Sequence, residues 1–179
     1  MAATGAIDRR AFIQRWRDRA QASDDPVDQF FSAWIALVVC ARPHLRPEDH
    51  DLRDTDRRAV LRLSESCRDA IFREIDSQKE ELAWLARRKG THRQDPIVDV
   101  YDFVHSAEHF RDRFRRLADH YSGERTSKPG LVVEAVIELL NHVRNNLFHG
   151  IKDPDDVDDR DLLRRLNPIL HAVLRGSGS

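Results

Sequence analysis

Apolar residues recur at helical spacing along most of the chain, and this periodicity constrains the fold more than any other feature. The clearest stripe runs through residues 27–38, where large apolar side chains stand at positions i, i+3, i+4 and i+7. In front of it, Asp25-Pro26 is an N-cap residue followed by a proline in the first turn. Pro43 should end this helix. Because no stretch of useful length alternates as a strand would, the sequence predicts an all-α fold.

The same periodicity predicts a bundle of about six to seven helices. A short first helix is marked over residues 12–20, and a third helix starts near Asp54. Ser77 and Glu80 have capping-box spacing, so a fourth helix begins there unless residues 54–89 form one long helix. The pattern alone leaves both arrangements open.

The second half of the chain has three more helical stripes. Asp95-Pro96 repeats the cap-and-proline signal, and Gly150 is a natural C′ residue for a helix that ends there. The aspartates between 153 and 159 lack the ligand spacing of a calcium-binding loop. They more simply cap the last helix, which Pro168 should bend. The predicted helices cover residues 101–121, 132–147 and 162–173.

Length and composition fit one domain. A chain of 179 residues can bury a sizeable core, and its 7 Gly and 7 Pro leave few helix breakers. We expect one helical domain over residues 1–175, followed by a flexible tail or expression scar over residues 176–179. Cys40 and Cys67 lie among apolar residues of predicted helices, so we expect two buried free thiols instead of a disulfide or a metal site.

Charge narrows the function classes. The chain has 30 Lys+Arg and 31 Asp+Glu, and its net charge of -1 argues against a protein that coats nucleic acid without specificity. An enzyme that contacts a few phosphates remains compatible with this balance. Residues 1–10 lack the apolar core of a signal peptide, and no apolar run approaches the length of a membrane span. We therefore expect a cytoplasmic protein with no membrane partner.

Residues 143–152, Val-Arg-Asn-Asn-Leu-Phe-His-Gly-Ile-Lys, place several polar groups at the end of an apolar helix. Asn145 and His149 are four residues apart and share a face. Arg144 and His149 stand about 140° apart on a regular helix. Their side chains would come together more readily in a site shared between two copies of the chain. Spacing alone also fits a plain helix end, in which His149 suits the helix dipole and Gly150 the C-cap.

This run resembles the signature of the HEPN superfamily. These proteins are small helical bundles, and many are RNases in toxin–antitoxin, abortive-infection and CRISPR systems. The resemblance rests on Arg-x4-His at Arg144 and His149, on the polar residue directly after the arginine, and on the run Asn-Leu-Phe-His-Gly. Residues 28–36 resemble the early helix of many HEPN proteins, and the similarity extends over residues 132–174. The resemblance implies a HEPN-like helical bundle.

The resemblance also implies a metal-independent endoribonuclease that needs no cofactor. Arg144 and His149 would be its catalytic pair, and Asn145 would occupy the polar position that assists them. Asn146 and Lys152 have no settled role in the family and are candidate substrate-binding residues, since Lys152 could contact phosphate. The chemistry suits these residue types, because histidine moves protons near neutral pH and arginine stabilises charge that builds on a phosphate.

HEPN domains typically dimerise, so the resemblance implies a homodimer whose two motifs line one cleft for RNA. The expected setting is toxin–antitoxin or phage defence, with an antitoxin or a nucleotidyltransferase as partner. Some HEPN toxins carry a tyrosine two residues after the histidine, which a nucleotidyltransferase modifies. Ile151 stands there in this chain, which argues against that mode of silencing. The alternative is a non-catalytic HEPN module that binds RNA, nucleotide or a partner protein, because fold alone does not establish function.

Two other patterns compete with this interpretation. His105, Glu108 and His109 match the His-x-x-Glu-His pattern of inverted zinc proteases. No third ligand is marked for them, and the exposed face of an amphipathic helix explains them more simply. Arginines cluster over residues 111–116, where they could guide RNA toward the cleft, although such a cluster is more often a solvated helix face.

Overall fold

The computed structural model describes residues 8–50, 54–87, 128–148 and 154–178. Within these ranges the chain forms helices and no strand, which confirms the predicted all-α bundle. The predicted helix over residues 101–121 lies outside the described residues. In chain order the elements are α1 (Arg9–Ala22), α2 (Pro26–Ala41), the 3-10 helices η1 (Arg42–His44) and η2 (Pro47–Asp49), α3 (Thr55–Ser66), α4 (Arg68–Asp76), α5 (Lys79–Arg87), α7 (Pro129–Phe148) and α8 (Val157–Gly176).

Side-chain caps fix where the first two helices begin. Asp8 accepts hydrogen bonds from two backbone N–H groups at the start of α1, at 3.0 and 3.3 Å. Asp25 accepts one from the N–H of Asp28 at 3.2 Å, and Pro26 follows it in the first turn, as predicted. Each cap satisfies donors that have no partner inside the helix. α1 and α2 then pack along each other.

Residues 54–87 form three helices, where the sequence left one or two open. Cys67 leaves helical geometry with φ −116° and ψ 21°, and it separates α3 from α4. The predicted capping box at Ser77 is not formed. The hydroxyl of Ser77 donates to the carbonyl of Glu74 at 2.5 Å, and α5 begins at Lys79. Ser77 therefore closes α4 instead of opening the next helix.

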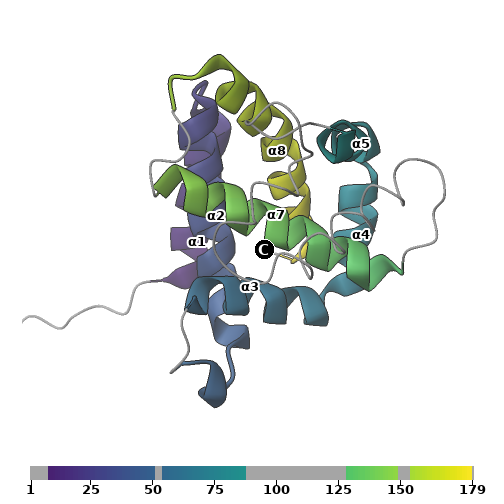
Figure 1. The fold of residues 1–179 in the computed structure, drawn as a ribbon. Helices are drawn as coiled ribbons and strands as arrows, with labels where there is room; N and C mark the ends of the chain where they lie inside the picture. The colour runs from purple at the N-terminus through teal and green to yellow at the C-terminus, as the bar shows by residue number, and fades with distance from the viewer. Residues whose placement is uncertain (1–7, 51–53, 88–127, 149–153, 179) are drawn as a thin grey trace, which may run out of the picture.

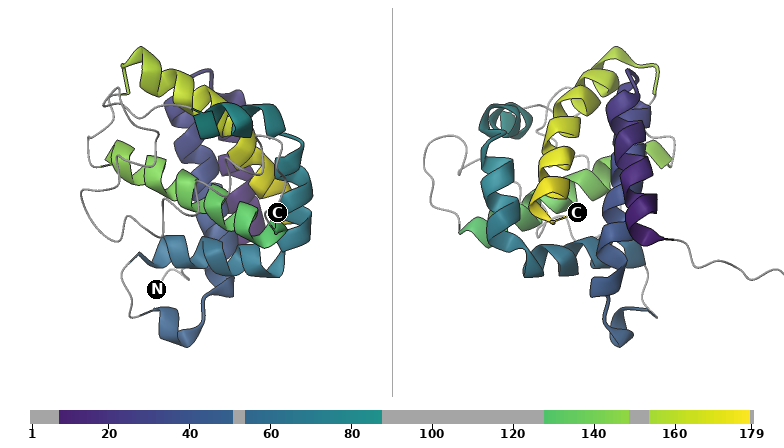
Figure 2. Two further views of the ribbon diagram at one scale, coloured as in Figure 1. Left: turned by 45° about the vertical axis from the view of Figure 1, so that its right-hand side comes forward. Right: turned by 180° about the vertical axis from the view of Figure 1, so that it is seen from behind.

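Most of the buried apolar residues come from α2, α7 and α8, and α3 and α4 contribute the rest together with a few from α1 and α5. α7 crosses the front of the bundle in Figure 1, and Figure 2 shows α1 on the opposite side of the molecule. α2 and α4 pack against α8, while α3 and α4 pack against α7. None of the described helices has the length and apolarity needed to cross a membrane. Large apolar side chains with no exposed surface include Phe30, Leu37, Ile71, Leu140 and Leu163.

The helix α8 begins at a side-chain cap, as the acidic segment before it predicts. Asp156 accepts hydrogen bonds from the N–H groups of Asp158 and Asp159, at 2.8 and 3.0 Å. The helix continues through Pro168. Its axis curves along its length in Figures 1 and 2, as expected where a proline removes one helical hydrogen bond.

The end of α8 is packed into the bundle. A Cβ at Gly176 would come 2.4 Å from the Cα of Ile71 on α4, so this close approach of two backbones requires glycine. Ser177 is 9% exposed, and its hydroxyl donates to the carbonyl of Leu174 at 2.7 Å. The predicted flexible tail over residues 176–179 is therefore wrong for Gly176 and Ser177, because both residues fill space between helices.

Both cysteines are free thiols, as predicted, but they are half-buried instead of fully buried. They lie beside the packed end of α8. The sulfur of Cys40 is 4.0 Å from the hydroxyl of Ser177, and the sulfur of Cys67 is 3.9 Å from its carbonyl oxygen.

Candidate functional site

The last two turns of α7 carry Arg144, Asn145 and Asn146 of the predicted motif, and Arg144 reaches from there toward α3. Its Nη1 donates to the Oδ1 of Asn145 at 2.7 Å, and its Nη2 lies 3.8 Å from the Oδ2 of Asp56. The Arg144 side chain is 24% exposed. A guanidinium that is positioned by neighbours and still reaches solvent can meet an anion with little loss of conformational freedom.

Asp56 lies in the first turn of α3 and faces two arginines. Besides Arg144, it lies near Arg42, whose Nη2 is 3.5 Å from the Oδ1 of Asp56. Arg42 begins η1, directly after α2. One carboxylate therefore connects the end of α2 with the end of α7.

A bidentate ion pair between Arg57 and Glu138 joins α3 to α7. The Nε of Arg57 donates to the Oε2 of Glu138 at 2.8 Å, and its Nη2 contacts the other carboxylate oxygen. The Glu138 side chain is only 6% exposed, against 29% for Arg57. Two parallel contacts in a mostly buried place fix both partners. Because Asp56 is the neighbour of Arg57, this pair also holds Asp56 opposite Arg144.

A second polar pair lies within α7 itself. The Nδ2 of Asn146 and the Nε2 of His142 are 2.8 Å apart, and the two residues are only 7% and 8% exposed. The distance fits one hydrogen bond between the side-chain amide and the imidazole ring. Asn146, a predicted substrate-binding residue, thus faces a buried histidine one turn earlier on its own helix.

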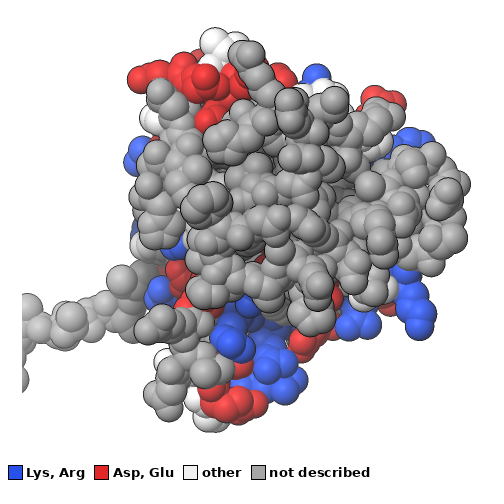
Figure 3. Space-filling view, viewed as in Figure 1, with Lys and Arg blue, Asp and Glu red and all other residues white. Residues whose placement is uncertain are grey.

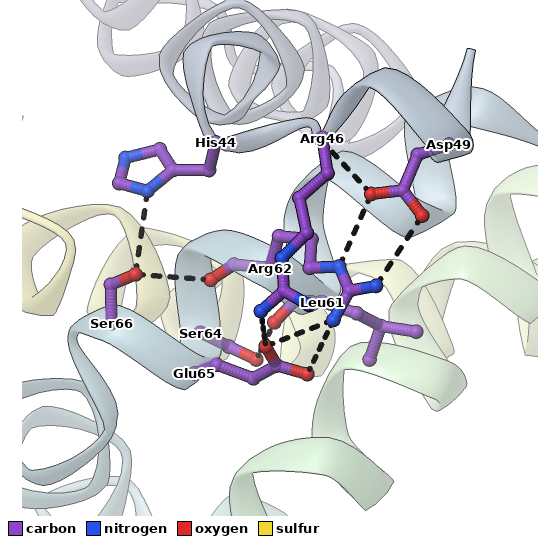
Figure 4. A network of polar contacts seen from close by, with 8 residues as sticks. All are labelled: His44, Arg46, Asp49, Leu61, Arg62, Ser64, Glu65 and Ser66. Atoms are coloured by element: carbon purple, nitrogen blue, oxygen red, sulfur yellow. Dashed lines mark hydrogen bonds and ion pairs between the residues drawn. The ribbon is translucent and has the colours of Figure 1, made fainter.

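The segment that follows Arg42 is anchored to α3 by a polar network, shown in Figure 4. Arg62 of α3 donates to both carboxylate oxygens of Asp49, at 3.2 and 3.4 Å, and the backbone N–H of Arg46 donates to the same carboxylate at 3.1 Å. The Arg62 guanidinium, followed by the Arg46 N–H, lowers the pKa of Asp49 below its ordinary value. The same contacts that favour the charged form of Asp49 attach η2 to α3.

Basic side chains gather beside the site. Figure 3 shows Lys and Arg side chains along the lower part of the molecule, where Figure 1 places α3 and the segment before it, with acidic side chains among them. Arg42 and Arg46 are well exposed, at 66% and 55% of their side chains. The arginines among the described residues of this region are Arg42, Arg46, Arg57, Arg58 and Arg62.

The structure brings together Arg144 and Asn145 from the predicted catalytic set. His149 and Lys152 lie outside the described residues, so the pairing of Arg144 with His149 stays a prediction. Residues 105–116, with the zinc-protease pattern and the arginine cluster, also lie outside them. In the part of the chain that is described, no group of three or more His, Cys, Asp or Glu side chains is arranged to hold a metal ion.

Sequence reasoning missed Asp56, Arg42 and the Arg57–Glu138 pair. Arg57 and Glu138 are 81 residues apart, and no local pattern connects them. The contact between His142 and Asn146 could have been predicted from their spacing in the sequence, because residues four apart on a helix are neighbours.

Comparisons with known proteins assign no family to the chain. No protein-family model matches the sequence. No curated protein matches it, and no solved structure does. The HEPN resemblance therefore rests on residues 28–36 and 132–174 of this sequence alone.

Proposed function

We propose that this protein is a metal-independent endoribonuclease of the HEPN type, with its active site at the end of α7. Arg144 and His149 are the catalytic pair, and Asn145 orients the arginine. The proposal is carried by the 2.7 Å hydrogen bond from Arg144 to Asn145, since it suits the assisting role that the resemblance implies for the polar residue. The exposed part of the Arg144 side chain leaves room for a phosphate oxygen.

The reaction uses the RNA's own 2′-hydroxyl as nucleophile. His149 transfers protons: the 2′-oxygen loses one, attacks the adjacent phosphorus, and the 5′-oxygen leaves with one. Arg144 stabilises the charge that builds on the phosphate oxygens, because a guanidinium stays charged and donates in a fork. The products are a 2′,3′-cyclic phosphate and a 5′-hydroxyl, and the reaction needs no oxidant, cofactor or metal ion.

The active unit in this proposal is a homodimer. One proton must be removed and another delivered, and two copies of His149 in one cleft supply both groups. Arg144 and His149 stand about 140° apart on a regular helix, so the two side chains of one copy point in different directions. A pair formed between Arg144 of one copy and His149 of the other avoids this difficulty. Light scattering at micromolar concentration should give the mass of two chains. A monomer that retains full RNase activity would contradict the shared cleft.

The biological setting that fits such an enzyme is toxin–antitoxin or phage defence. A small antitoxin is the more suitable partner, because Ile151 stands where some HEPN toxins carry the tyrosine that a nucleotidyltransferase modifies.

RNA cleavage with end-group analysis tests the function directly. A single-stranded RNA labelled at its 5′ end should be cut at the same rate with and without EDTA. The same sequence as DNA should stay intact, because it has no 2′-hydroxyl. End-group analysis should find the cyclic phosphate and the 5′-hydroxyl.

Each departure from this pattern has its own meaning. Activity that stops in EDTA and returns with zinc would favour a metal site at His105, Glu108 and His109. A 5′-phosphate product would contradict the 2′-hydroxyl mechanism. A chain that binds RNA and never cuts it would be the non-catalytic HEPN module.

A further inference from the structure

Two arginines from distant parts of the chain converge on one carboxylate beside the motif. Arg144 of α7 lies 3.8 Å from one oxygen of Asp56, and Arg42 of η1 lies 3.5 Å from the other. The Arg42 side chain is 66% exposed, whereas those of Asp56 and Arg144 are 32% and 24% exposed. The more exposed arginine thus lies on the outer side of the carboxylate.

These contacts differ from the ion pair that holds α3 against α7. The Arg57–Glu138 pair is bidentate and mostly buried, with one contact at 2.8 Å. The contacts of Asp56 are longer, and its side chain is 32% exposed against 6% for Glu138, so they add less to stability than the Arg57–Glu138 pair does. An arginine in a loose, exposed pair can exchange its carboxylate for a phosphate oxygen at small cost, and it gains charge-assisted hydrogen bonds.

The backbone under Arg42 is fixed on both sides. Its N–H donates to the carbonyl of Val38 at the end of α2, and its own carbonyl accepts from the N–H of Leu45 at 3.2 Å. The Asp49–Arg62 network of Figure 4 then ties the following segment to α3. Arg42 therefore projects an exposed side chain from a fixed backbone, where a polymer backbone can reach it.

We propose that Arg42 binds a second RNA backbone phosphate, near the phosphate at Arg144, and that Asp56 pairs with both guanidinium groups until RNA displaces it. This inference rests on the proposed function, since it takes RNA as the substrate. Arg42 touches a phosphate that does not react, so it contributes to binding and to the KM rather than to the chemical step.

The variant Arg42→Gln tests this assignment, with Arg19→Gln as a matched control. Arg19 pairs with Asp28 at similar exposure, 59% and 33% of the two side chains. Asp28 lies in the first turn of α2, about 20 Å along that helix from Arg42 at its usual rise per residue. Both changes are made in the His149→Ala chain, so that RNA stays intact while its binding is measured over a range of salt concentrations.

Arg42→Gln should weaken binding of a single-stranded RNA roughly three- to tenfold. It should also reduce the slope of the logarithm of the binding constant against the logarithm of salt concentration by about 0.7. Each phosphate contact releases counterions from the RNA, and the variant makes one such contact fewer. Arg19→Gln should change neither quantity. In the chain with His149 intact, Arg42→Gln should raise the KM and leave kcat unchanged.

For a second variant we expect a change in RNA affinity of opposite sign. Asp56→Asn removes the carboxylate that competes with phosphate and should tighten RNA binding by a few-fold. Weaker binding by Asp56→Asn would overturn the role given to Asp56.

The outcomes separate the inference from the proposed function. If the wild type cuts RNA and Arg42→Gln shows the salt slope of Arg19→Gln, the Arg42 site is overturned and the ribonuclease stands. If RNA is bound and never cut while Arg42→Gln lowers the slope, the phosphate site stands without the enzyme. A chain that neither binds nor cuts RNA overturns both.

Discussion

Alanine in place of His149 should slow RNA cleavage by about 10²–10⁴-fold, the usual size of a general acid–base contribution. Arg144→Ala should cost a similar factor, by analogy with the loss of one oxyanion donor. Among the described residues, Arg144 makes a charge-assisted hydrogen bond to Asn145, its chain neighbour, and a long contact to Asp56, and neither fixes one helix tightly to another, so we expect the Arg144→Ala chain to stay folded. The measurement is single-turnover cleavage of a labelled RNA, with circular dichroism of each variant.

Two further substitutions make this result specific. Arg144→Lys keeps the charge but loses the fork that contacts both Asn145 and Asp56, so its activity should fall between wild type and Arg144→Ala. His171→Ala removes a half-buried histidine from α8 and should leave the rate unchanged. Folded His149→Ala and Arg144→Ala chains that cleave as the wild type does would defeat the catalytic assignment.

The local parts of this fold could be predicted from the sequence. Asp25-Pro26 predicted the start of α2, and the acidic segment predicted the cap at Asp156, because a cap acts within a few residues. The split at Cys67 was missed, since the apolar stripe continues across it. The packed glycine at position 176 was taken for a tail, because only the approach of α4 reveals its role.

The candidate site was likewise predictable only in the part that is local in the sequence. The motif on α7 is contiguous, so Arg144 and Asn145 were found from spacing and resemblance. Their surroundings come from elsewhere: Asp56 lies 88 residues earlier than Arg144, and Arg42 earlier still. A sequence without aligned relatives gives no signal for such pairs, because they exist only after α3, η1 and α7 have packed together.

The largest effect on stability should come from Glu138→Ala. This change leaves the Arg57 guanidinium in a mostly buried place without its carboxylate, which usually costs more than the pair contributed. Because Arg57 is 29% exposed, water recovers part of the loss. We expect the free energy of unfolding to fall by about 2–4 kcal/mol. Thermal unfolding should then shift down by roughly 5–15 °C.

The matched control is Glu65→Ala, since Glu65 also pairs with an arginine of α3 but is 49% exposed. Loss of that pair should cost less than about 1 kcal/mol, as exposed ion pairs do. The double variant Arg57→Met/Glu138→Leu replaces both charges by apolar groups and should recover most of the stability that Glu138→Ala loses. If Glu138→Ala unfolds no more easily than Glu65→Ala, the pair does not hold α3 to α7, and the fixed position of Asp56 opposite Arg144 loses its physical basis. A stability loss in Glu138→Ala that the double variant restores would instead show that the unpaired charge, rather than the missing side-chain volume, weakens the contact between these helices.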